Sequence, residues 1–159
     1  MAHPGRPAGY TGPAYPEMDV RDTVSRVGVP VDVAGVSVTV SRVYWQQAPH
    51  PTICVDMSVV NGSPSRLSYE SYTAFGLVSF NKGELYVADG GSSTFGQWLE
   101  ISPRQSVAAT LCFGRARSGR YVLSGGAPGF LDGLPSTSRA DVHPVWLFDI
   151  GPKGVSQLP

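Results

Sequence analysis

The two cysteines, Cys54 and Cys112, are the residues of this chain best placed to react with each other. They are 58 positions apart, each in a segment patterned as a strand, and a bridge closing that loop would stabilise the fold by about 4 kcal/mol. Each shares the parity of polar residues, Cys54 with Asp56 and Cys112 with Thr110. A bridge is therefore predicted to join neighbouring strands of one sheet on its outer face. The alternative is two unpaired, half-exposed thiols that act as small hydrophobic side chains.

The three histidines are scattered along the chain. His3 lies in the N-terminal tail, and His50 and His143 stand beside prolines in predicted loops. The usual spacing of metal ligands is absent, and two cysteines exclude a four-cysteine zinc site. We expect solvated loop histidines, no metal and no cofactor.

Two glycine-rich stretches are predicted to be turns. Residues 90–94 lack the second glycine of the G-x-S-x-G motif, and residues 125–129 lack the lysine of a phosphate-binding loop. Asp89 and Glu100 are surface acids that a hairpin can bring together without catalysis. Because no activated nucleophile is recognisable, we expect no enzyme activity.

The charge balance excludes a long-range attraction to nucleic acid. Lysine plus arginine equals aspartate plus glutamate, at 12 each. Arg115, Arg117 and Arg120 form a compact basic group beside Tyr121, which suits a local anion contact or, as we expect, a solvated hairpin end.

The tryptophans have two interpretations. They are interface anchors if exposed and core residues if buried, and in a sandwich the core is the commoner place. They are Trp45, Trp98 and Trp146.

Neither a signal peptide nor an integral membrane segment is recognisable in the sequence. Met1 is followed by a His-Pro-Gly-Arg run, and no window reaches about 18 uninterrupted apolar residues. Either the chain is cytosolic as written, or an export segment precedes it.

The clearest strand is residues 53–60, where strict alternation leads into Asn61-Gly62. Further strands are expected at 29–33, 36–44, 67–72, 74–80, 85–87, 98–101, 106–113, 121–123 and 145–150, and three of these patterns assign faces. One face carries Ile53, Val55, Met57 and Val59; another carries Val36, Val38, Val40 and Tyr44; a third carries Val107, Ala109, Leu111 and Phe113. Short strands at hairpin spacing, without an amphipathic helix, predict an all-β, antiparallel sandwich, with a barrel as the alternative.

The ends of the chain are predicted to be less ordered. Residues 3–16 have the composition of a solvated, flexible Pro/Gly-rich tether, in which Tyr10 and Tyr15 are candidate contacts for a partner. Residues 16–26 are compatible with a helical turn. We therefore expect a tail and lead-in at 1–26, a sandwich domain at 27–151 and a C-terminal tail at 152–159.

Several segments resemble a known family. Residues 27–31 and 36–43, the strand end Val60-Asn61-Gly62-Ser63, and Ile101-Ser102-Pro103 before 106–113 are similar to the telokin-like, immunoglobulin-like domains of actinobacterial exported proteins. These include the DUF4352 group and small secreted mycobacterial antigens. The resemblance spans roughly residues 27–125 and implies an immunoglobulin-like β-sandwich, an extracytoplasmic home and no shared catalytic residues.

The chain departs from that family in three ways. It has no signal sequence or lipobox cysteine, Arg104 stands where the family commonly has glycine after Pro103, and the segment after Gly125 is longer. Two functions are expected. The first is a non-enzymatic extracytoplasmic module that binds a protein or cell-envelope component through its loops, above all residues 125–144. The second is a structural subunit of a virion or multi-subunit assembly, in which the N-terminal tail contacts neighbours.

Overall fold

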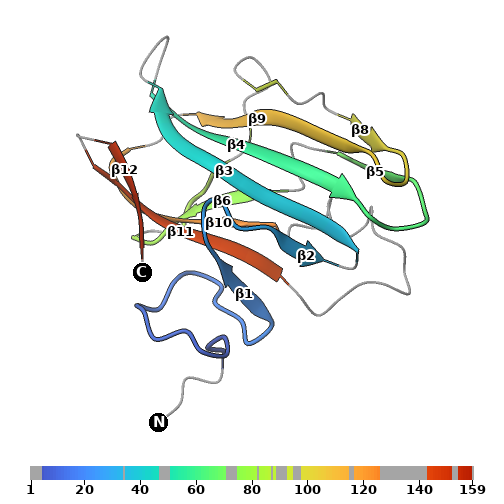
Figure 1. Ribbon diagram of the computed structural model, residues 1–159. Helices are drawn as coiled ribbons and strands as arrows, with labels where there is room; N and C mark the ends of the chain where they lie inside the picture. Colours follow the sequence, from blue (N-terminus) through green and yellow to red (C-terminus); the bar gives the residue numbers. More distant parts are fainter. Residues whose placement is uncertain are drawn as a thin grey trace.

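The polypeptide folds into two facing layers of β-strands (Figure 1). The computed structural model describes residues 5–33, 35–46, 51–70, 75–81, 83–86, 88, 93–94, 98–114, 117–125, 143–151 and 154–158. The strands found there are β1 (Asp22–Ser25), β2 (Val31–Val33), β3 (Val36–Gln46), β4 (Thr52–Asn61), β5 (Leu67–Glu70), β6 (Gly76–Ser79), β7 (Leu85–Tyr86), β8 (Trp98–Ile101), β9 (Ser106–Gly114), β10 (Gly119–Ser124), β11 (His143–Gly151) and β12 (Gly154–Gln157).

One layer, here called the β11 sheet, has the order β1-β11-β10-β6-β7, with β12 also paired to β11. The other, the β4 sheet, has the order β2-β3-β4-β9, and β5 pairs separately with β8. The pairings are antiparallel except for β1, which runs parallel to β11. The predicted all-β sandwich is confirmed.

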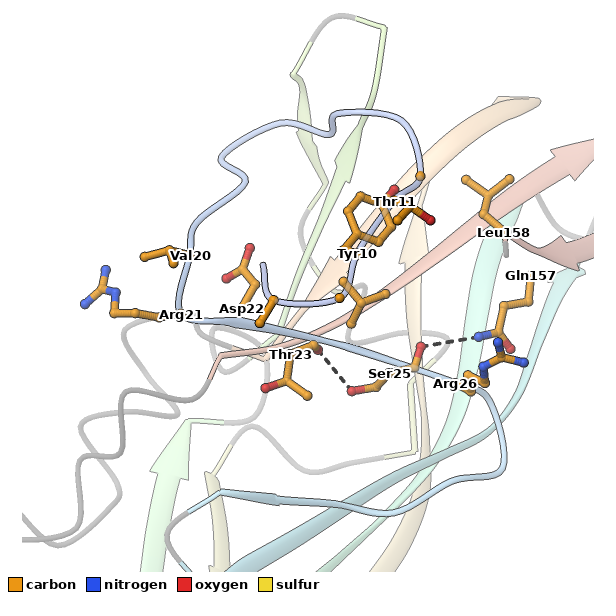
Figure 2. Close-up of a pocket in the computed structure, with 14 residues that line it drawn as sticks. Tyr10, Thr11, Val20, Arg21, Asp22, Thr23, Ser25, Arg26, Gln157 and Leu158 are labelled. Atoms are coloured by element: carbon orange, nitrogen blue, oxygen red, sulfur yellow. Dashed lines mark hydrogen bonds between the residues drawn. The ribbon is translucent and has the colours of Figure 1, made fainter. Parts of the chain in front are cut away.

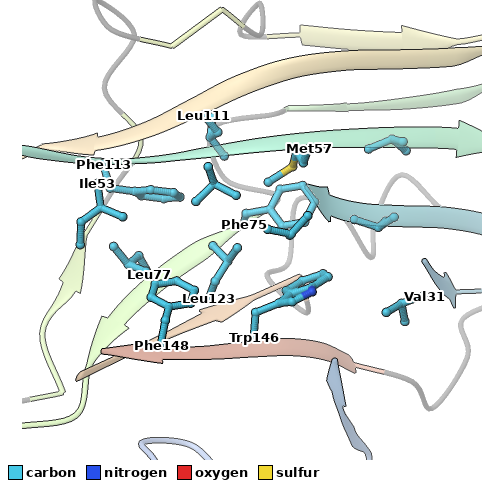
Figure 3. Packing of buried hydrophobic residues seen from close by; sticks show 14 of the residues in the cluster. Val31, Ile53, Met57, Phe75, Leu77, Leu111, Phe113, Leu123, Trp146 and Phe148 are labelled. Carbon is cyan, nitrogen blue, oxygen red and sulfur yellow. The ribbon is translucent and has the colours of Figure 1, made fainter. Parts of the chain in front are cut away.

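The core fills the space between the two layers, as Figure 3 shows. The predicted inward face of β4 is confirmed, because its four apolar residues are at most 2% exposed. Leu111 and Phe113 of β9 and Trp146 and Phe148 of β11 complete the centre of the cluster. Period-two alternation thus decides which side chains of β4 face the core between the layers.

A β-bulge in β3 overturns one predicted face. The register with β4 shifts between Val40 and Arg42, so one extra residue reverses the alternation of everything after it. Val43 and Trp45 pack against the core, and Tyr44 lies opposite Cys54 on the outer face. The prediction that Tyr44 shares the face of Val40 is wrong.

Strands β1 and β12 lie where the sequence predicted a helical turn and a tail. Both pair with β11, β1 along its first residues and β12 along its last. Neither segment has an apolar alternation of its own, so its conformation depends on the ladder that β11 offers. The helical turn at 16–26 is therefore wrong over β1, and the C-terminal tail is wrong over β12.

Residues 5–18, here called the cover segment, pack on the outer face of the β11 sheet. Tyr10 is 9% exposed and Tyr15 is 6% exposed. The two tyrosines form a second apolar cluster with four residues on the outer face of the sheet, which are Val78, Val122, Val145 and Leu147. The expectation of a solvated tether is wrong for residues 5–16, because composition alone does not reveal an apolar sheet face waiting to be covered.

Within the described residues, no helix is long and apolar enough to cross a membrane.

Candidate binding site around strand β1

The cover segment is held in shape by its own contacts. Arg6 Nη1 donates to the carbonyl of Gly12 at 2.7 Å, and its guanidinium lies 5.5 Å from the ring centre of Tyr10. Tyr10 Oη donates to the carbonyl of Pro13 at 2.6 Å, and Tyr10 N donates to Pro7 O at 3.2 Å. These bonds close a compact loop that presents the two tyrosines to the sheet.

Aromatic packing attaches this loop to the sandwich. The rings of Tyr10 and Tyr15 meet edge to face with centres 5.6 Å apart, and Tyr15 lies 6.4 Å from Phe80 beyond β6. Burial raises the pKa of the Tyr10 phenol, an effect that nearby Arg6 reduces. The contact is chiefly apolar, since both rings lie on valine and leucine side chains of the β11 sheet.

A polar cluster forms where the cover segment meets β1. Tyr15 Oη donates to Asp22 Oδ2 at 2.8 Å, and Asp19 N donates to the same oxygen at 3.0 Å. His143 Nδ1 lies 3.7 Å from Asp22 Oδ1, with side-chain exposures of 19% and 6%. Asp22 and His143 are register partners in the parallel β1–β11 ladder. The expectation that His143 is a solvated loop residue is wrong, because it begins β11 beside a buried carboxylate.

In this cluster the Tyr15 phenol acts as a hydrogen-bond donor. Burial, and then the hydrogen bond to Asp22, raise the pKa of the Tyr15 phenol, so it stays protonated and a weak nucleophile at neutral pH. At the exposed side of the cluster, hydrogen bonds from Arg21 lower the pKa of the Asp19 carboxyl group to about 2. Sequence reasoning missed this cluster, since nothing local signals that residues 22 and 143 will be partners.

Three hollows surround β1. The largest, about 550 Å³, lies between residues 8–12 of the cover segment, β1, and Gln157 with Leu158 (Figure 2). A second of about 190 Å³ is lined by Tyr15, Asp22 and His143. A third of about 490 Å³ lies between β1 and residues 29–32. The seam between the cover segment and the sandwich is therefore open on both sides.

Strand β1 ends the order of the β11 sheet, and the first and third hollows lie along it. Gln157 secures its far end, donating from Nε2 to Ser25 O at 3.3 Å (Figure 2). Its Oε1 also accepts from Val27 N at 3.0 Å. Val20 and Val29 flank the strand and are 60% and 50% exposed. An edge strand with apolar residues at its ends is a surface suited to an extended polypeptide.

The structure joins Cys54 and Cys112 by a disulfide with a Cα–Cα distance of 4.1 Å. They are direct partners on β4 and β9, the neighbouring strands that the sequence predicts for a bridge. Both are at most 1% exposed, and Cys112 N donates to Ser93 Oγ at 2.9 Å. The sulfurs are too enclosed for a catalytic thiol, and the bridge is structural.

The remaining candidate residues do not form a site among the described residues. Tyr121 is 2% exposed and bonds through Oη to Arg117 N and O at 3.1 and 2.7 Å, so it belongs to the core and not to an anion site. Arg117 and Arg120 are exposed. Glu100 pairs with Arg66. No three metal-binding side chains lie together in the described part of the chain.

Two of the tryptophans, Trp45 and Trp146, contribute to the core. Trp146 is 0% exposed at the centre of the core, and Trp45 packs partly buried against it. Neither acts as an exposed anchor, and the indole Nε1 of each is buried without a hydrogen-bond partner. Trp98 lies in β8.

Several sequence candidates fall outside the described residues. Of the serine-rich loop, Ser93 and Thr94 are described, and Thr94 Oγ1 accepts from Thr110 N at 2.7 Å along the edge of β9. The candidates that lie outside the described residues are His3, His50, Asp89, residues 90–92, Arg115, and residues 126–142 of the long loop.

Comparison with known proteins supports the fold class. No protein-family model matches the chain, and no curated protein matches it in sequence. The YjhA protein of Bacillus subtilis aligns with a TM-score of 0.53 and 14% identity, over 75% of this chain and 95% of that one. A B. subtilis strain 168 protein, YcdA, provisionally assigned as a lipoprotein, aligns with a TM-score of 0.52 and 15% identity, over 78% of this chain and 38% of that one.

An uncharacterized β-sandwich protein of Clostridium difficile 630 aligns at 10% identity and a TM-score of 0.49, over 78% of this chain and 92% of that one. The arrangement of the strands and the similarity to the two Bacillus subtilis structures define an all-β sandwich protein.

Proposed function

We propose that this protein is a non-enzymatic, extracytoplasmic module of the immunoglobulin-like, telokin-like kind that binds a protein or cell-envelope component. The observation that carries the binding role is the set of three hollows around the edge strand β1, with exposed Val20 and Val29 beside them. An open edge strand offers main-chain hydrogen bonds, and adjoining hollows accept side chains. The structure thus draws attention to β1, whereas the sequence favoured the loop at 125–144.

The disulfide supports the extracytoplasmic part of the proposal. A buried bridge between Cys54 and Cys112 persists in an oxidising compartment and is rare in cytosolic proteins. The similarity to YcdA, provisionally assigned as a lipoprotein, agrees with a location at the cell envelope.

The test of the binding role is capture of partners from envelope material on the immobilised full chain. Val20→Asp combined with Val29→Asp places two charges beside β1, and we expect it to abolish capture of any specific partner. Leu85→Asp is the matched control, because Leu85 is 65% exposed and belongs to a different strand, β7. The proposal falls if nothing specific is captured, or if both variants capture the same partner equally.

The location has its own test. Intact mass of the protein from its native host, with and without reductant before thiol alkylation, reports whether Cys54 and Cys112 are bonded and whether the N-terminus has been processed. A bonded pair on a processed chain supports export. Two free thiols on a chain beginning at Met1 contradict it.

A second candidate is a structural subunit of a larger assembly, in which the N-terminal segment contacts neighbouring copies. The specific observation in its favour is that Tyr10 and Tyr15 already dock residues 5–18 onto a sheet face of this same fold. Light scattering tests it. A strictly monomeric chain in every preparation would count against it.

A further inference from the structure

We propose that the outer face of the β11 sheet is a docking site for the cover segment of a second copy of this chain. Residues 5–18 of one molecule leave their own sheet and occupy the same face of another, which gives a segment-exchanged dimer or a chain of linked subunits. This inference rests on the second candidate function above and specifies its contact surface.

The cover segment is held together by its own hydrogen bonds, so it can be exchanged as a unit. Its hydrogen bonds from Arg6 to Gly12, from Tyr10 to Pro13 and from Tyr10 to Pro7 begin and end within the segment. Its attachment to the sheet is by packing of aromatic rings, plus the bond from Tyr15 to Asp22. Exchange therefore leaves the strand ladders of both sheets intact.

The outer face of the β11 sheet carries an apolar patch that is unfavourable to expose to water. Two apolar side chains of β11, one of β10 and one of β6 point outward beneath the tyrosines, and all are buried by the cover segment: Val145, Leu147, Val122 and Val78. Leaving such a patch in water is unfavourable by about 25 cal/mol for each Å². An identical segment from a second copy restores every contact, which is why exchange of identical elements is a low-cost route to association.

The backbone is strained at the C-terminal end of the cover segment, where the chain turns toward β1. Glu17 lies between Tyr15 and β1 and has a φ of 59°, a left-handed conformation that a residue with a side chain rarely adopts. Turn bonds from Met18 N to Tyr15 O at 3.2 Å and from Asp22 N to Asp19 O at 3.0 Å fold the connection back. A short, strained hinge favours exchange, because opening it releases the strain.

The margins of the cover segment border solvent. Hollows of about 550 Å³ and 190 Å³, both open to the surface, lie along the segment on either side. Its attachment to the sheet is therefore concentrated at the buried rings of Tyr10 and Tyr15.

The concentration dependence follows from the tether. A short tether gives a segment an effective concentration of the order of millimolar on its own sheet. Exchange between free molecules is thus expected near that concentration, and each 1.4 kcal/mol of hinge strain released on opening lowers it by about tenfold. Within an assembly, neighbours supply the concentration.

The test uses the full chain, concentrated to about 1 mM, with molecular mass measured by light scattering. A mixed sample contains copies with ¹³C-labelled valine and leucine methyl groups and unlabelled copies. We expect a dimer, and isotope-filtered nuclear Overhauser contacts from tyrosine rings of unlabelled copies to the methyl groups of Val122, Val145 and Leu147 of labelled ones. A synthetic peptide of residues 3–18 is expected to compete.

Two substitutions at an exposed position keep the test independent of folding. Glu17→Gly removes the strain of the closed hinge, and we expect it to weaken dimerisation by about tenfold. Glu17→Gln is the matched control, since it keeps the side chain and the strain, and its dimerisation is expected to be unchanged. Tyr10→Ala with Tyr15→Ala is expected to abolish the dimer.

Three results would overturn the exchange. They are a monomer at 1 mM that does not bind the peptide, a dimer whose ring-to-methyl contacts are all intramolecular, and a dimer that survives both tyrosine substitutions. If larger assemblies form in the host without these contacts, the subunit role stands and the exchange fails.

Discussion

At the scale of single residues, Asn61 shows how a turn signal becomes a structural anchor. It is 0% exposed, its Nδ2 donates to the carbonyls of Ser65 at 2.7 Å and Ile101 at 2.9 Å, and its Oδ1 accepts from Ser63 Oγ at 2.7 Å. Asn61→Ala leaves these buried groups unpaired and is expected to lower the free energy of unfolding by about 3 kcal/mol. Urea denaturation measures this. The control Ser58→Ala, on the half-buried outer face of β4, is expected to change it by less than about 0.5 kcal/mol.

Arg104 occupies a backbone conformation better suited to glycine. Its φ is 65°, in the left-handed region. Arg104→Gly removes the strain of the side chain but adds unfolded-state entropy, so we expect a gain of up to about 1 kcal/mol. Arg104→Val is expected to cost about 1–2 kcal/mol, since β-branched residues are disfavoured at positive φ. Thermal denaturation ranks the three proteins, and a glycine variant below the wild type contradicts the argument.

At the scale of elements, the cover segment should respond to alkaline pH. The folded pKa of Tyr15 lies above the unfolded value near 10, so its contribution to docking is complete below about pH 10 and is lost as the pH rises further. The expected loss approaches about 1 kcal/mol per pH unit. Limited proteolysis of residues 5–18 between pH 8 and 11 measures release.

The matched variant for this experiment is Tyr15→Phe, which keeps the ring and removes the ionisable group. It is expected to retain the cover segment to higher pH than the wild type. Phenolate absorbance near 295 nm reports ionisation of all the tyrosines, and the difference between the wild type and Tyr15→Phe isolates the signal of Tyr15. Burial together with neighbouring Tyr121 raises the pKa of Tyr86 to about 12, and its signal is common to both proteins. If both proteins release the segment in parallel, ionisation of Tyr15 is not the cause.

At the scale of the whole molecule, the disulfide connects strands formed by distant parts of the sequence. Cys54→Ala combined with Cys112→Ala frees a loop spanning 58 positions and is expected to lower the free energy of unfolding by about 4 kcal/mol. Guanidinium denaturation with and without reductant measures the loss. The wild type should fall to the level of the double variant in reductant, and the variant itself should be insensitive to it. An unchanged midpoint in the double variant would contradict the prediction.

The sequence by itself determined the class of fold and the buried face of the central strands. In β4 and β9 the alternation of apolar and polar residues is a local property of an extended chain, and it correctly placed Met57 and Leu111 in the core. The parity of Cys54 and Cys112 likewise predicted that a bridge between them would join neighbouring strands. Such inferences succeed because they need only each residue's immediate neighbours.

The tertiary structure alone decided the rest. The bulge before Arg42 reversed the faces at the end of β3, β11 recruited two segments that have no strand pattern of their own, and the outer face of the β11 sheet buried Tyr10 and Tyr15. The candidate site depends on these events, since Asp22 meets His143 only because β1 runs parallel to β11. Each is a pairing between residues far apart in the chain, whose energy comes from a partner that no local pattern specifies.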